Sequence, residues 1–149
     1  MQSLQQDPRR SNLASIDKSS MVGLSSFEGG AVHRKFVDDS MKSRTPSLRS
    51  LNASEARLIA EAIGGRFLDY KLDDATEWAI AVKPLPSFEI YYFLQRYTPE
   101  FEDRVQVLFS KESAAIGLPG EDVAHFVILY ANAIIHAARR VLKRELPKV

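Results

Sequence analysis

The sequence predicts an α+β domain: a short antiparallel hairpin or three-stranded sheet packed against helices, with a long C-terminal helix and a disordered N-terminal tail. Three observations predict this fold class. The first fifty residues are rich in Ser and poor in aromatics, two later runs alternate apolar and polar residues, and the last segment repeats apolar residues at helical spacing. With 149 residues, 45% of them apolar, the chain has room for one folded domain.

Residues 1–50 are expected to form the disordered tail, and residues 51–149 the compact domain. Eleven Ser residues lie in the first fifty positions, whereas only two of the fourteen aromatic residues, Phe27 and Phe36, precede Leu51. The apolar residues of this segment show no sustained period of either two or 3.6. The tail carries a net charge of +3 and the domain −2, a difference too small to predict that one docks on the other.

A helix is predicted from Ala53 to Ile63. Asn52 is suited to cap its first turn, Glu55 occupies the third helical position of a capping box, and Leu51 precedes the cap as in a hydrophobic staple. The Gly64-Gly65 pair then supplies a left-handed stop, which residues with a Cβ resist.

Two alternating runs after this helix predict a β-hairpin. One face holds Leu68, Tyr70 and Leu72 in the first run and Trp78, Ile80 and Val82 in the second. The opposite face, where Ala79 and Ala81 stand among charged residues, is expected to contact water. Pro84 and Pro86 are expected to end the second strand, because proline has no N–H to donate to a sheet.

The middle of the domain is less clearly patterned. The segment from Ser87 to Tyr97 fits both periods, and we favour a helix because Ser87 is a good cap and Pro99 a natural stop. The segment from Arg104 to Ser110 stays open between strand and helix. Its alternating valines favour a third strand, whereas the preceding Thr98-Pro99 is typical of a helix start.

The last predicted element is a helix from about Glu121 to Leu146, with acidic residues at its start and four basic residues near its end. It is apolar or small nearly all round and is interrupted by His125, Asn132 and His136, so we expect it to be buried on several sides. The apolar stretch is shorter than a bilayer requires, and no membrane span is predicted.

Candidate chemistry is sparse. The absence of Cys excludes disulfides, thiolate metal sites and cysteine nucleophiles, and neither a nucleophile elbow nor a phosphate-binding loop occurs. His125 and His136 lie too far apart along one helix to share a metal ion. We therefore predict no catalytic residue, metal or cofactor, and an enzyme is the less favoured class.

Composition also bears on partners and location. A net charge of +1 disfavours a dedicated nucleic-acid binder, which needs a larger basic excess to contact phosphates. The polar N-terminus lacks the apolar region of a secretory signal, so a cytoplasmic location is expected.

The leading functional hypothesis is a non-enzymatic protein-interaction or regulatory module that self-associates through the C-terminal helix. Aromatic and apolar side chains outside the predicted hairpin are the candidates for partner binding: Tyr91, Tyr92, Tyr97, Phe126, Tyr130 and Ile134. Two alternatives remain open. One is a small ligand-binding domain or enzyme whose pocket is not recognisable from sequence, and the other is a cargo protein addressed by its N-terminal tail.

Overall fold

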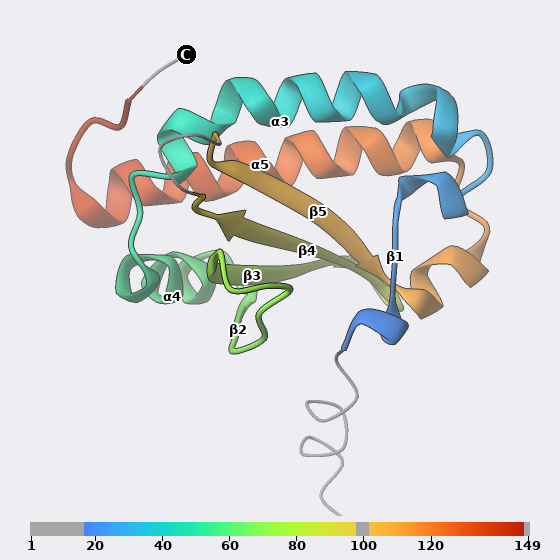
Figure 1. Ribbon diagram of the computed structural model, residues 1–149, viewed down its shortest axis with the longest axis horizontal. Coiled ribbons are helices and arrows are strands. Elements are labelled where there is room, and N and C mark those ends of the chain that lie inside the picture. Colours follow the sequence, from blue (N-terminus) through green and yellow to red (C-terminus); the bar gives the residue numbers. More distant parts are fainter. Residues whose placement is uncertain (1–16, 98–101, 148–149) are drawn as a thin grey trace, which may run out of the picture.

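The computed structural model describes residues 17–97 and 102–147 (Figure 1). Its main elements are β1 (Met21–Val22), α3 (Arg34–Leu48), α4 (Ala53–Ala62), β2 (Arg66–Leu68), β3 (Thr76–Leu85), β4 (Phe88–Gln95), β5 (Arg104–Ser110) and α5 (Gly120–Leu142). Four short 3-10 helices accompany them: η1 (Lys18–Ser20), η2 (Leu24–Ser26), η3 (Gly30–His33) and η4 (Lys111–Ile116). The predicted α+β class is confirmed, but the sheet is larger than predicted.

The sheet is antiparallel and has five strands in the order β1-β5-β4-β3-β2. Of the described helices, α3, α4 and α5 lie on one side of it, and α3 and α5 run side by side in the same direction (Figure 1). Between these helices and the sheet lies the main core, in which Ile80 of β3 stands opposite Tyr92 of β4, and Tyr92 opposite Val107 of β5. Residues 104–110, for which the sequence left strand and helix open, form strand β5.

The predicted hairpin is only partly correct. Strand β2 ends at Leu68, and Leu68, Tyr70 and Leu72 pack on the face of the sheet opposite to that of Trp78, not on the same face. Strand β3 continues through Pro84 to Leu85, so the proline does not end it.

The two faces of the hairpin also differ from the prediction in their exposure. Trp78 is buried in the main core as expected, and its indole N–H donates to the carbonyl of Leu51 at 2.9 Å. Ala79 and Ala81 do not contact water, because Tyr91 and Phe93 pack with them in a second cluster on the other face of the sheet. Both faces of the central strands are therefore apolar.

This two-sided burial explains why the predicted helix at residues 87–97 is wrong. Seven of the eight residues of β4 are buried, so the strand lacks the polar alternation that would have distinguished it. Ser87, interpreted from the sequence as a helix cap, instead occupies the turn between β3 and β4 with a left-handed backbone (φ 67°).

The predicted disordered tail is also wrong for residues 17–50, whereas its first sixteen residues lie outside the described part of the chain. This segment forms β1 and α3, and Phe27, Met41 and Leu48 enter the main core. Helix α3 escaped sequence analysis because its buried side includes Thr45 and Ser47. Their hydroxyls donate to the carbonyls of Met41 (2.8 Å) and Pro147 respectively, which makes polar residues compatible with burial. The domain therefore begins well before Leu51.

Two glycines join the N-terminal segment to α5. The backbone N–H of Gly120 donates to the carbonyl of Glu28 at 2.7 Å. A Cβ on Gly120 would stand 2.4 Å from the Cα of Gly30, so only glycine permits this approach. The Pro119-Gly120 entry to α5 is thus the point at which the start of the folded domain contacts its last helix.

The helices predicted at residues 53–63 and 121–146 are both confirmed, and their ends differ from the predicted ones. Helix α4 has the expected capping box, in which Asn52 accepts from the N–H of Glu55 and Glu55 accepts from that of Asn52. Helix α5 ends at Leu142 rather than near Leu146, and it packs on the sheet, α3 and α4. Of the helices in residues 17–97 and 102–147, none combines the length and apolar character needed to cross a membrane.

Helix α5 provides a first prediction, because Ile134 is fully buried whereas Leu129 is 59% exposed. Replacing Ile134 by Ala is expected to lower the free energy of unfolding by about 2–5 kcal/mol, since the cavity cannot collapse in a packed core. The matched Leu129→Ala change is expected to cost less than about 0.5 kcal/mol. Urea unfolding followed by circular dichroism measures both, and equal losses would contradict the assigned orientation of α5.

Helix α4 provides a second prediction. The Glu55 carboxylate binds the guanidinium of Arg144 at 2.7 Å and the N–H of Asn52 at 3.0 Å. The hydrogen bond from Arg144 is the largest cause that lowers the pKa of Glu55 below its ordinary value of 4.5, and the hydrogen bond from the N–H of Asn52 lowers it further. Because the folded state holds the charged form, this stabilisation is present above pH 4.5 and is lost as the pH falls through the lowered pKa.

The Glu55→Gln variant should therefore be less stable than the wild type near neutral pH and approach it in acid. Urea unfolding of both proteins across a pH series measures the difference. A difference that stays constant at all pH values would show that the charge of Glu55 contributes nothing.

Candidate functional site

Three of the six side chains predicted to bind a partner belong to the interior. Tyr92 and Ile134 are fully buried in the main core, and Tyr91 is 3% exposed in the second cluster. The Tyr92 hydroxyl donates to the carbonyl of Val127 at 2.6 Å, and the Tyr91 hydroxyl donates to Glu89 at 2.9 Å. Burial raises the pKa of both phenols, so they remain neutral donors. None of the three is available to a partner in this conformation.

The other three lie nearer the surface. Phe126 and Tyr130 are partly buried on α5 and pack against the main core, and the ring centroid of Phe126 lies 5.5 Å from that of Phe88. Tyr97, directly after β4, is also partly buried, and it lines a cavity between α3 and the sheet. Of the predicted set, Tyr97 alone leads to a candidate site.

The histidines of α5 give no metal site. His125 and His136 are both exposed on the outer side of the helix. Within the ranges that the structure describes, no group of three or more His, Asp or Glu side chains is arranged to hold a metal ion.

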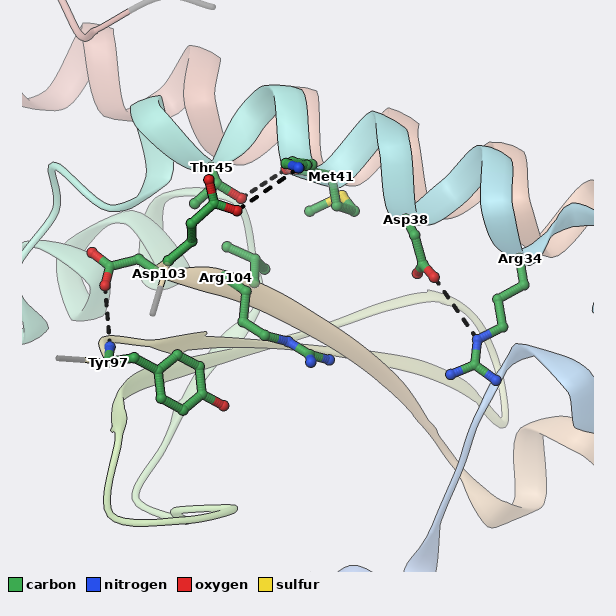
Figure 2. A pocket seen from close by; sticks show the side chains of 10 residues that line it. Arg34, Asp38, Met41, Thr45, Tyr97, Asp103 and Arg104 are labelled. Atoms are coloured by element: carbon green, nitrogen blue, oxygen red, sulfur yellow. Dashed lines mark hydrogen bonds and ion pairs between the residues drawn. The ribbon is translucent and has the colours of Figure 1, made fainter. Parts of the chain in front are cut away.

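A cavity of about 710 Å³ opens between α3 and the start of β5 (Figure 2). Helix α3 contributes five side chains to it, and the end of β4 and the start of β5 contribute the rest. The lining residues are Arg34, Asp38, Met41, Lys42, Thr45, Tyr97, Glu102, Asp103, Arg104 and Val105. A smaller cavity of about 120 Å³ shares several of these residues and continues along β5 as far as Phe109, where Gly23 and Leu24 close it. We call the two together the β5 groove.

The β5 groove has a charged rim and an apolar floor. On the rim, Arg34 lies 3.8 Å from Asp38, and Lys42 lies 3.8 Å from Glu102. All four side chains are largely exposed, so these pairs contribute little to stability. On the floor, Met41, Val37 and Val105 are buried, and each also belongs to the main core.

Asp103 holds one end of the groove together. Its carboxylate accepts the backbone N–H of Tyr97 at 3.1 Å and lies 3.1 Å from Arg49 and 3.6 Å from Arg96. Arg96 also pairs with Glu77 and donates to the carbonyl of Arg49. Asp103 thus connects the end of β4 and the start of β5 to the end of α3, and its oxygens are occupied by structural partners.

The backbone of β5 is the most distinctive part of the groove. On one side β5 pairs with β4 along its whole length, but on the other side β1 pairs only with Phe109 and Ser110. The stretch from Arg104 to Leu108 therefore has an edge without a neighbouring strand among the residues described. In an antiparallel sheet alternate residues direct their N–H and C=O groups toward such an edge, which can accept another strand.

The sequence did not reveal this site, because its α3 residues lie in the segment predicted to be disordered. One signal was present: the pairs Arg34–Asp38 and Lys35–Asp39 have the i, i+4 spacing typical of an exposed helix face. The same segment spaces Val37, Met41 and Leu48 as one helical stripe. The open edge of β5 has no signature in sequence, since it depends on how far β1 extends.

Comparison with known proteins gives no family for this chain. No protein-family model, curated protein or solved structure matches it. The geometry of the β5 groove is therefore the basis for a functional proposal.

The Asp103 cluster provides a third prediction. Replacing Asp103 by Asn should lower the free energy of unfolding by about 1–3 kcal/mol, because two arginines lose a partner that is 12% exposed. The neighbouring Glu102→Gln change should cost less than about 0.5 kcal/mol, since that carboxylate is largely exposed. Urea unfolding measures both. A similar loss in the two variants would mean that the cluster does not anchor β5.

Proposed function

We propose that the protein is a non-enzymatic interaction module that binds an extended segment of another polypeptide along the open edge of β5. The single observation that supports this proposal is the unpaired stretch from Arg104 to Leu108 beside the β5 groove. Addition of a strand to an exposed sheet edge is a common mode of peptide recognition, in which backbone hydrogen bonds supply affinity and side-chain pockets supply specificity.

The edge lacks two of the features, a proline and a bulge, by which proteins commonly block such additions. Exposed edges are commonly protected by proline, by bulges or by a covering element. The uncovered end of β3 has both Pro84 and an irregular register near Val82. Residues 104–108 have no proline and pair with β4 in regular register. Helix α3 lies over them, but the cavity between α3 and the strand leaves room for a chain.

The groove also defines the chemistry of the segment. Side chains directly opposite each other on neighbouring strands lie on the same face of the sheet. Partner residues opposite Val105 and Val107 would point to the apolar floor beneath α3, so they should be apolar. A partner residue opposite Arg104 would lie beside an exposed guanidinium that makes no ion pair with the described residues, so an acidic residue suits that position.

The position of α3 favours a linear segment over a second copy of the domain. The β5 edge is recessed between α3 on one side and the turn of η2 at the end of the groove. A β5 strand from a second copy would carry its own α3 and η2 with it, whereas a single extended segment needs only the width of one strand. Helix α5 is also a weak self-association surface, because its exposed row places Leu129 among His125, Asn132 and His136.

A small-molecule site is the second candidate, because the larger cavity has a volume in the range of ligand pockets. Its polar groups argue against this function. Asp103 is occupied by structural partners, Arg34–Asp38 and Lys42–Glu102 form exposed pairs on the rim, and Arg104 is exposed. An enzyme or binding site would need buried polar groups that converge on the ligand.

The proposal predicts the behaviour of two neighbouring variants of α3. Asp38 lines the β5 groove and Asp39 does not, although both are exposed near the start of α3. Peptides of about twelve residues, selected from a random library on the wild-type protein, should bind about tenfold more weakly to Asp38→Trp than to Asp39→Trp. The indole is expected to fill the groove without disturbing the core. Titration by fluorescence anisotropy measures the affinities, and circular dichroism checks both folds.

Hydrogen exchange in the presence of a selected peptide should show new protection at residues 104–108. Equal affinity for the two variants would place the binding surface elsewhere and overturn the proposal. So would a dimer, detected by light scattering in the absence of peptide, that Asp38→Trp converts to a monomer, because the groove would then hold a second copy.

A further inference from the structure

A second groove lies on the opposite side of α3, where it packs beside α5. It has a volume of about 450 Å³ and is lined by Ser43, Arg44, Ser47, Asn132, Ile135, His136 and Arg139. Three of these residues come from α3 and four from α5, so the groove exists only because the two helices run side by side (Figure 1). We call it the α3–α5 groove.

The charged side chains that line the α3–α5 groove are all basic. Arg44 and Arg139 line it, and no carboxylate does. Six other arginines in the described part of the chain have a carboxylate partner: Arg34, Arg49, Arg57, Arg66, Arg96 and Arg144. Four arginines have none among the residues described. Of these, Arg104 and Arg140 are exposed, whereas Arg44 and Arg139 are partly buried.

The hydrogen bonds of the two arginines are also incomplete. Arg44 donates to neutral acceptors: the side-chain oxygen of Asn132 at 2.7 Å, the carbonyl of Ser40 at 2.9 Å and the hydroxyl of Ser43 at 3.5 Å. The Nε of Arg139 is buried and has no hydrogen-bond partner in the described structure. A buried guanidinium N–H without an acceptor costs free energy, and an anion in the groove would remove that cost.

We propose that the α3–α5 groove binds a phosphate group. A guanidinium presents its N–H groups in a planar fork that matches the oxygens of phosphate, and two such groups can bind different oxygens of one tetrahedral anion. The His136 ring adds a further N–H donor at the same groove, and Ile135, which is 8% exposed, forms an apolar wall. A carboxylate, with only two oxygens, would satisfy fewer of these donors.

This site is independent of the β5 groove. Arg44 and Arg139 do not line the β5 groove, and Asp38 does not line the α3–α5 groove. Loss of peptide binding in a β5-groove variant therefore leaves the phosphate proposal in place, and the reverse also holds.

The test uses the full chain, with inorganic phosphate and pyrophosphate as probes, at about 0.15 M salt, where attraction between exposed charges is largely screened. Isothermal titration calorimetry should show saturable binding that weakens by about tenfold in Arg139→Gln. The adjacent Arg140→Gln variant removes an exposed charge that does not line the groove, and it should change the affinity by less than about twofold. Arg44→Lys keeps the positive charge but loses the planar guanidinium with its paired N–H donors, so it should also weaken binding.

Two further arms identify the source of the phosphate group. Sedimentation with phosphatidylcholine vesicles, with and without phosphatidic acid, tests a lipid headgroup, whereas calorimetry with pyrophosphate tests a soluble ligand. Binding in either arm that depends on Arg139 but not on Arg140 supports the proposal. Absence of saturable binding in both arms, or equal loss in Arg139→Gln and Arg140→Gln, overturns it. Thermal denaturation of each variant without ligand confirms that the fold is retained.

Discussion

The burial of α5 between the sheet and α3 is the constraint on which the remaining structure depends. The helix buries residues on two sides, so the sheet alone cannot cover it, and α3 must pack beside it. That requirement brings the N-terminal segment into the domain, and the close approach of Gly30 to Gly120 fixes where the segment meets α5. Once α3 is placed, the two grooves follow, because one lies on each side of it. The phenol of Tyr92 and the indole of Trp78 then connect the sheet to the surrounding backbone.

Elements with one solvent-exposed face can be predicted from the sequence. Helix α4 shows its cap, its apolar stripe and its glycine stop within a few residues, and each is found in the structure. Elements cannot be predicted in this way where burial removes the contrast between faces or where polar residues are buried. Strand β4 is apolar on both faces, so its alternation is hidden. Helix α3 buries Thr45 and Ser47, whose hydroxyls are satisfied by carbonyls, so its stripe does not read as apolar. In both cases the pattern depends on residues from other parts of the chain that pack against the element, and the local sequence does not show which residues these are.

The candidate sites were harder to predict than the fold for the same reason. Tyr97, which the sequence predicts to bind a partner, does line the β5 groove, but the α3 part of the groove lies in the segment predicted to be disordered. An open strand edge is a property of pairing, and β1 leaves five residues of β5 uncovered because the chain turns into η2 after two residues. The unpaired arginines of the α3–α5 groove become informative only when the partners of the other arginines are known. Each site is thus defined by a partner missing among the described residues: a neighbouring strand for β5, and a carboxylate for Arg44 and Arg139. The sequence alone does not show which partners are missing.

The pairing of β1 with β5 also has a kinetic consequence. Met21 stands opposite Ser110, so this ladder joins positions far apart in the sequence, whereas β3, β4 and β5 are consecutive. Closing a long loop costs more conformational entropy than closing a short one, and contacts of large sequence separation form slowly. The meander of β3, β4 and β5 can assemble before β1 arrives. A newly made chain would then pass through a stage in which the whole of β5 is uncovered, and aggregation at that stage is limited by how quickly the N-terminal segment docks.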